Sequence, residues 1–183
     1  MKPTEQLKEE HEEIGLMLRV LTEISRRLKA AEKVDPRDIE QAVEFIKVFA
    51  DKCHHGKEED VLFPEMEKTG ISRRAGPIGV MLSEHNAGRD FVRGMSEAAG
   101  AYGAGDTAAA GKFADNALGY AGLLARHIYK ENNVLYPMAD ARIPADVQDR
   151  MLDRFKEIEL AIGEGAHERL HEGLHRLAAG YLK

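Results

Sequence analysis

Two short segments of this chain place a histidine and a glutamate four residues apart. The first pair is His54 and Glu58, and the second pair, His127 and Glu131, follows 73 residues later. On an α-helix, residues four apart share a face, with about 5–6 Å between their Cβ atoms. An imidazole nitrogen and a carboxylate oxygen so placed can bind one metal ion, so each pair is a candidate half of a metal site.

The residues that follow the two pairs also repeat. Segment 57–64 returns as segment 130–137 with Lys, Glu, Val, Leu and Pro at matching positions, and Tyr136 takes the place of Phe63. Upstream, Glu10 and His11 return as Glu84 and His85, 74 residues later. The chain therefore consists of two similar halves, and a duplication of this kind constrains the fold.

The repeat distinguishes between two neighbouring His-x-x-x-Glu pairs in the first half. His55 and Glu59 have the same spacing as the pair one residue before them, but their counterparts are Ile128 and Asn132. Isoleucine and asparagine cannot bind a metal ion as a histidine and a glutamate do. The repeat therefore places His55 and Glu59 on a neighbouring face and predicts that loss of His55 leaves metal binding intact.

Each half should form a helical hairpin. Its first helix has one histidine near the start, and its second helix has the His-x-x-x-Glu pair near the end. In an antiparallel hairpin those two ends lie at the same level, so four histidines and two glutamates should converge in one layer of a four-helix core.

This pattern resembles the hemerythrin-like (HHE cation-binding) family of non-haem di-iron four-helix bundles, over roughly residues 4–140. The resemblance implies two iron ions joined by an oxo or hydroxo bridge, with zinc or manganese as substitutes. It carries the family's ligand motif to His11, His54, Glu58, His85, His127 and Glu131.

The sequence departs from the oxygen-carrying members at one position. Those proteins have a further histidine one turn from the histidine of the third helix, whereas Met81 and Arg89 flank His85 here. The resemblance therefore implies an open position on both metals and speaks against reversible oxygen carriage. It favours the binding or sensing of oxygen, or of a related diatomic or redox signal.

The alternative is a di-iron enzyme: a peroxidase, an oxygen reductase or a nitric-oxide-related iron-repair protein. Its small ligand would then be a diatomic molecule or peroxide. The chain has one cysteine, Cys53, and therefore no Cys-x-x-Cys motif of a rubredoxin-like site. An enzyme of this kind would need an external electron donor. Turnover with a reductant and peroxide would distinguish it from a sensor.

Composition excludes several other classes of protein. Of the 183 residues, 43% are hydrophobic and 32% charged, and the net charge is −6. The acidic balance argues against nucleic acid as a partner, and no apolar run approaches the roughly 18 residues of a membrane span. A single cysteine, without a signal-peptide core, predicts a reducing cytoplasm. We expect Cys53 to be an inert, buried or semi-buried thiol, with a redox role as the alternative. A homodimer is compatible with the sequence.

The apolar spacing predicts an all-α chain. Helices over 4–31, 36–64, 77–102 and 106–137 should form an up-down four-helix bundle within a domain of residues 1–140. Thr4, Asp35 and Asp106 are the candidate N-caps. Two additional C-terminal helices, one over 144–162 and one after Gly165, should form an extension of residues 141–183 that packs on the bundle.

The last helix has three histidines spaced four apart, His167, His171 and His175. Three readings stay open: a polar or interface stripe, which we favour, a ligand for the core site, and a secondary metal site. In the fourth helix, Tyr120 lies two turns before the metal-site histidine. It either donates a hydrogen bond that supports a metal ligand, or lines the approach to the metals, or only packs.

Overall fold

The structure, a computed structural model, describes all residues except 75, 164 and 183, and the described chain is helical with no β-strand. The all-α prediction is thus confirmed. Four helical runs lead up to residue 142. They are α1 (Pro3–Lys29); α2 (Pro36–Phe45) continued by η1 (Ile46–His55), η2 (Glu58–Leu62) and α3 (Phe63–Lys68); α4 (Pro77–Gly103); and α5 (Ala109–Lys130) continued by η3 (Glu131–Leu135) and α6 (Tyr136–Arg142).

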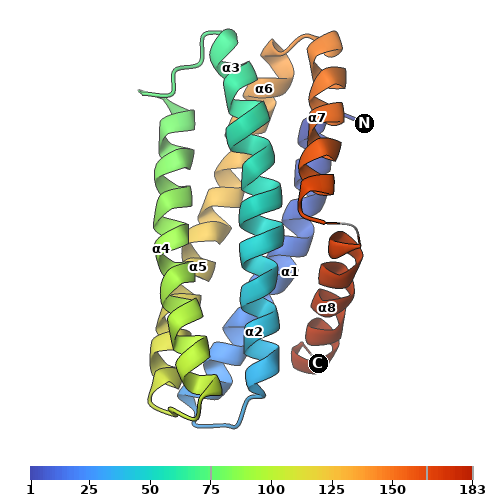
Figure 1. Ribbon diagram of the computed structural model, residues 1–183. Coiled ribbons are helices and arrows are strands. Elements are labelled where there is room, and N and C mark those ends of the chain that lie inside the picture. The colour runs from blue at the N-terminus through green and yellow to red at the C-terminus, as the bar shows by residue number, and fades with distance from the viewer. Residues whose placement is uncertain (75, 164, 183) are drawn as a thin grey trace.

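The four runs lie side by side and alternate in direction along the chain (Figure 1). The α5 helix packs against both α1 and α4, and α2 packs against α4. The starts of α1 and α4 and the ends of α3 and α6 therefore gather at the same end of the molecule (Figure 1).

Local sequence explains where the helices begin. Asp35 caps α2 as predicted: its Oδ1 accepts a hydrogen bond from the backbone N–H of Arg37 at 2.9 Å, and Pro36 takes the first helical position. The prediction for Thr4 was wrong. Pro3 already starts α1, since proline fits the first turn, and the Thr4 hydroxyl donates to Asp140 at 2.7 Å.

Asp106 binds a backbone N–H group in the turn that precedes α5. Its Oδ1 accepts from the backbone N–H of Ala108 at 3.0 Å, and α5 begins at Ala109. The side chain therefore closes a turn before the helix and does not cap its first residue.

Two apolar clusters fill the interior, and a polar layer lies between them. The larger cluster includes Leu21, Phe49 and Phe113. The second, nearer the ends of α3 and α6, includes Leu62, Leu135 and Phe155. Between these two groups along each helical run come the buried histidines and glutamates. A polar layer enclosed in this way is stable only if its members satisfy one another or bind an ion.

Two further helices, α7 (Ala145–Ala161) and α8 (Ala166–Tyr181), lie along one side of the four runs (Figure 1). The α7 helix contacts α1 and η2, and α8 contacts α1 and α2. Their apolar residues Phe155 and Leu174 are fully buried. No helix in the described chain combines the length and the apolar character that crossing a membrane requires.

Candidate metal centre

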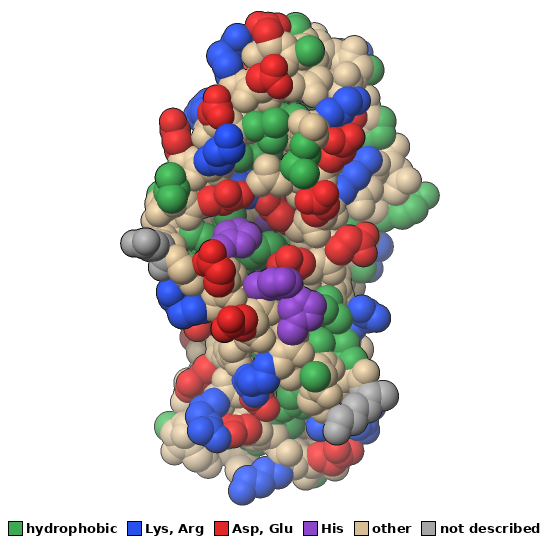
Figure 2. Space-filling model, turned by 90° about the vertical axis from the view of Figure 1, so that its right-hand side faces the viewer, with side chains coloured by type: hydrophobic (Ala, Val, Ile, Leu, Met, Phe, Trp, Pro, Cys, Tyr) green, Lys and Arg blue, Asp and Glu red, His purple; other side chains and the backbone are tan. Residues whose placement is uncertain are grey.

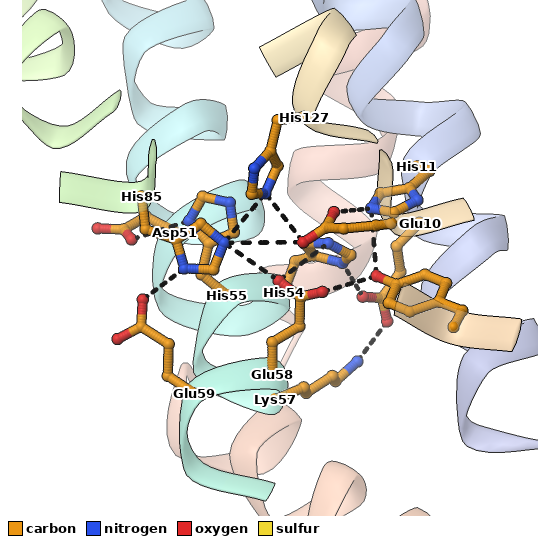
Figure 3. Close-up of polar contacts among 12 residues, drawn as sticks. Glu10, His11, Asp51, His54, His55, Lys57, Glu58, Glu59, His85 and His127 are labelled. Atoms are coloured by element: carbon orange, nitrogen blue, oxygen red, sulfur yellow. Dashed lines mark hydrogen bonds and ion pairs between the residues drawn. The ribbon is translucent and has the colours of Figure 1, made fainter. Parts of the chain in front are cut away.

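The six residues predicted as ligands lie together in the polar layer, and none is more than 4% exposed. They come from all four helical runs. Figure 3 labels His11, His54, Glu58, His85 and His127, whose side chains point toward one another. The donor atoms of the predicted ligands fall into two groups, within each of which the atoms lie no more than 4.8 Å apart. One group is His11, His54 and Glu131, and the other is Glu58, His85 and His127 together with His55, which was not predicted as a ligand. The ligand set itself stays a prediction, because the structure describes the protein chain alone.

Glu131 faces histidines of both halves. Its Oε2 lies 3.2 Å from Nε2 of His11, and its Oε1 lies 2.9 Å from Nε2 of His127 and 3.9 Å from Nε2 of His85. A carboxylate between two groups of imidazoles can bridge two ions.

Glu58 has the matching position from the other half. Its Oε2 lies 3.4 Å from Nε2 of His85 and 3.8 Å from Nε2 of His54. The two glutamates thus stand between the two histidine groups, and both are fully buried.

Three carboxylate oxygens in this layer accept no hydrogen bond of adequate geometry: Oε2 of Glu58 and both oxygens of Glu131. The imidazole nitrogens lie at ion-pair distance but out of alignment. Buried polar atoms without partners are rare in folded proteins and call for an explanation.

The buried carboxylates strongly affect the imidazoles. Burial alone would lower the pKa of His85, but the carboxylates of Glu131, Glu58 and Glu59 raise it to about 11. The pKa of His127 is also raised, by Glu131 and Glu58 against the effect of burial. The layer therefore attracts positive charge, as a cation site must.

Each predicted histidine ligand is fixed through its other ring nitrogen. The Nδ1 atom lies within 2.9 Å of an oxygen in every case, and the pairs are His11 with Asn132, His54 with Glu10, His85 with Glu59, and His127 with Glu84. A carboxylate or amide on Nδ1 sets the orientation of the ring and leaves Nε2 for an ion.

These partners follow the repeat. Glu10 holds the histidine of the second helix, and its counterpart Glu84 holds that of the fourth. Each glutamate also pairs with a repeated lysine, Lys57 or Lys130. Asn132, which sequence reasoning set aside because it cannot bind a metal as Glu59 can, supports His11 instead. The repeat contained a signal for this contact, because Asn132 is the counterpart of Glu59, which supports His85 in the same way.

Turns of π-helix occur in both runs that carry a His-x-x-x-Glu pair. The stretches η2 and η3 begin at the two repeated glutamates, Glu58 and Glu131. The stretch η1 has no counterpart, because the equivalent residues 119–128 belong to α5. The wider π turn is uncommon and occurs frequently at functional sites.

His55 is the residue that the sequence misplaced. It was expected on a neighbouring face, but it is 3% exposed and its ring stacks on that of His85, with 3.8 Å between centroids and 16° between planes. Its Nδ1 lies 3.2 Å from Oδ1 of Asp51. A turn of π-helix reduces the angle between successive side chains to roughly 80–90°, so His54 and His55 both reach the interior. Burial and the neighbouring imidazoles lower the pKa of His55 to about 3.

The repeated ring after each pair also belongs to the site. Phe63 stacks on His85 at 5.9 Å, and Tyr136 stacks on His11 at 5.5 Å. The Tyr136 hydroxyl donates to Oε1 of Glu58 at 2.7 Å and lies 3.3 Å from Nε2 of His11. The substitution of Tyr for Phe between the halves was visible in the sequence, but its polar contact was not predicted.

Histidine side chains gather among acidic ones on the face drawn in Figure 2. In the last helix His171 and His175 are exposed, and His167 is half-buried. The rings of His171 and His175 lie 4.4 Å apart, and Nδ1 of His171 is 3.8 Å from Glu13. His167 packs against Phe49. None of the three joins the candidate ligand groups found in the described chain. Tyr120 is buried in the larger apolar cluster.

Cys53 should react slowly with thiol reagents in the native protein. Its side chain is 1% exposed, and burial is the main cause that raises its pKa to about 12. Since the thiolate is the reactive form, we expect labelling by a disulfide reagent at pH 8 to be at least 100-fold slower in buffer than in denaturant. Equal rates would show that the thiol is accessible.

A known family model matches most of the chain. The family model described as "Hemerythrin HHE cation binding domain" matches residues 2–139. Curated proteins of Mycobacterium tuberculosis and Mycobacterium bovis, described as uncharacterized, are each 25% identical over 156 residues. The alignment covers 85% of this chain and 60% of each relative's length. No solved structure matches the chain significantly.

Proposed function

The chain belongs to the hemerythrin HHE cation-binding family, and from this membership we propose that its buried layer binds two iron ions with which the protein binds or senses oxygen or a related diatomic or redox signal. In this proposal the runs from α1 to α6 form the family's up-down four-helix bundle, residues 1–140. The helices α7 and α8 are its extension, residues 141–183.

The observation that carries the proposal is the set of unpartnered oxygens on Glu58 and Glu131. A cation would satisfy them. The Nε2 atoms of His85 and His127 lie 3.0 Å apart, which is the separation of two donors at right angles around an ion about 2.1 Å from each. Imidazole and carboxylate donors suit iron, manganese and zinc.

The residues of this chain have separate tasks in the proposal. Glu58 and Glu131 neutralise the ions from between the histidine groups. The Nδ1 partners fix the imidazoles. Leu62 and Leu135, which are at most 1% exposed, exclude water from one side of the layer. Bound iron would supply one-electron redox chemistry and coordination positions for a small ligand.

The Tyr136 hydroxyl favours the second candidate, a di-iron enzyme with an external electron donor. It places an O–H group 3.3 Å from Nε2 of His11, at the edge of the layer where a proton can be held for a reacting ligand. Consumption of peroxide by the iron-loaded protein with an added reductant would test this. If the enzyme hypothesis is correct, Tyr136→Phe should slow turnover at least tenfold without loss of iron.

Iron content and stability should change together. We expect the purified chain, loaded anaerobically with Fe(II), to hold two irons, and we expect chelation to lower its melting temperature because ligands that bind only the folded state stabilise it. Metal analysis and calorimetry provide the measurement. Less than one iron per chain after loading, with no change in melting temperature, would contradict the proposal.

A further inference from the structure

The two sides of the metal centre are related by the repeat but differ at four positions. The side of His85 is polar where the side of His11 is mostly apolar or small. The counterparts, at offsets of 73 or 74, are His55 and Ile128, Asp51 and Leu124, Glu59 and Asn132, and Arg89 and Gly15.

On the polar side, His55 stands where an additional ligand would. A ring nitrogen of His55 lies within 4.8 Å of a carboxylate oxygen of Glu58 and of ring nitrogens of His85 and His127. Asp51 holds its Nδ1, which leaves Nε2 for an ion. This is the same arrangement that the other buried histidines have.

Arg89 closes this side. Its Nε donates to Oδ1 of Asp51 at 2.9 Å, and its second guanidinium nitrogen donates to Oε1 of Glu59 at 2.8 Å. The same oxygen of Glu59 holds Nδ1 of His85. The groove on this face, between α2, η1 and α4, has a volume of about 410 Å³, and none of the candidate ligands is among its lining residues.

On the other side, His11 lies at the base of a groove between α1 and α5, with its side chain 1% exposed. The volume of this groove is about 610 Å³, and its lining includes His11, Gly15, Leu18, Ala121, Gly122 and Ile128. A Cβ atom added at Gly15 would meet nothing within 4 Å. Glu12, Arg19 and Thr22 also line the groove, but most of the lining residues are small or apolar, which suits a ligand of two or three atoms.

We propose that His55 is a seventh protein ligand, to the metal held by His85 and His127, and that a small exogenous ligand binds only the metal held by His11 and His54, through the groove between α1 and α5. This inference rests on the proposed function. It replaces the expectation that both metals have an open position, because the side chain that completes one shell comes from the second helix and not from the third.

Azide binding to the iron-loaded, oxidised protein tests the proposal. We expect the wild-type protein to bind one azide for each pair of irons, and Mössbauer spectra of the ⁵⁷Fe-loaded protein to show that azide shifts one of two doublets. His55→Ala should bind a second azide or lose one iron. His171→Ala, at an exposed histidine, is the matched control and should behave as the wild type does.

Two further variants change residues beside His11 and leave those beside His85 unchanged. Ile128→His puts an imidazole at the position equivalent to His55, and it should keep two irons but weaken azide binding at least tenfold. Gly15→Leu adds a side chain that narrows the groove, and the added Cβ atom would meet no other atom within 4 Å. This variant should keep the azide stoichiometry but slow azide binding at least tenfold. Both remain informative if His55→Ala fails to fold.

Different results would contradict His55 as a ligand, the groove as the route, and the proposed function. If His55→Ala holds two irons, binds one azide and has an unchanged Mössbauer spectrum, His55 is not a ligand. If Ile128→His and Gly15→Leu both bind azide as the wild type does, the groove is not the route. Absence of iron from the wild-type protein itself would instead overturn the proposed function.

Discussion

His54→Ala and Glu131→Ala are each expected to lose at least one of two bound irons, and to lower the unfolding free energy of the loaded protein by about 3–5 kcal/mol. Both side chains are at most 2% exposed. Removing His54 leaves Glu10 and Glu58 without their shared imidazole, and removing Glu131 leaves three histidines without their central carboxylate. Metal analysis and urea denaturation give the two quantities.

His171→Ala is the control for both variants. Its side chain is 48% exposed and lies 3.8 Å from its acidic neighbour, so its loss should change stability by less than about 1 kcal/mol and should leave the iron content at two. Retention of two irons by either His54→Ala or Glu131→Ala would show that the ligand set is wrong.

Lys57→Met should destabilise the protein by about 3–5 kcal/mol, because it leaves a buried carboxylate without its cation. The Lys57 ammonium is fully buried between Glu10 and Glu159, and it donates to the latter at 2.6 Å. Together with His54, Lys57 outweighs the effect of burial and holds the pKa of Glu10 at about 2. Urea denaturation of the iron-loaded protein measures the change.

The repeat supplies the control for that prediction. Lys130 occupies the equivalent position beside Glu84, but its side chain is 37% exposed. Lys130→Met should therefore lower the unfolding free energy by no more than about 1 kcal/mol. Equal losses for the two variants would mean that burial of Lys57 is not the cause.

The sequence predicted the helical fold and the buried layer because the duplication tests each residue against a second copy. Six candidate ligands were chosen in this way, and all six are buried together. The cap at Asp35 was confirmed for a local reason, since Asp followed by Pro satisfies the first turn with nearby atoms alone. The start of α1 was misplaced by one residue because Pro3 takes the first helical position, and the bond from the Thr4 hydroxyl to Asp140, 136 residues away, was not predictable.

The comparison of the two copies also explains why His55 was wrongly predicted to lie on a neighbouring face. A repeat argument discounts any residue that lacks an identical counterpart, and His55, Tyr136 and Arg89 all lack one. The π-helical turns added to the error, because spacings of four residues fit α- and π-helices alike and only the folded backbone distinguishes them. The sequence did contain a signal for His55. Asp51 precedes it by four residues, so on one helix the Asp51 carboxylate can bind Nδ1 of His55 and orient its ring.

The contact between α7 and the layer bears on which part of the chain can fold alone. The family match ends at residue 139, but Glu159 is one of the two carboxylates that neutralise Lys57, and Phe155 packs beneath the same ammonium with its ring centroid 5.6 Å away. A chain cut at the family boundary would expose that ammonium to water and would remove the apolar cover of η2. The contacts that hold Lys57 in place therefore extend beyond the end of the family match.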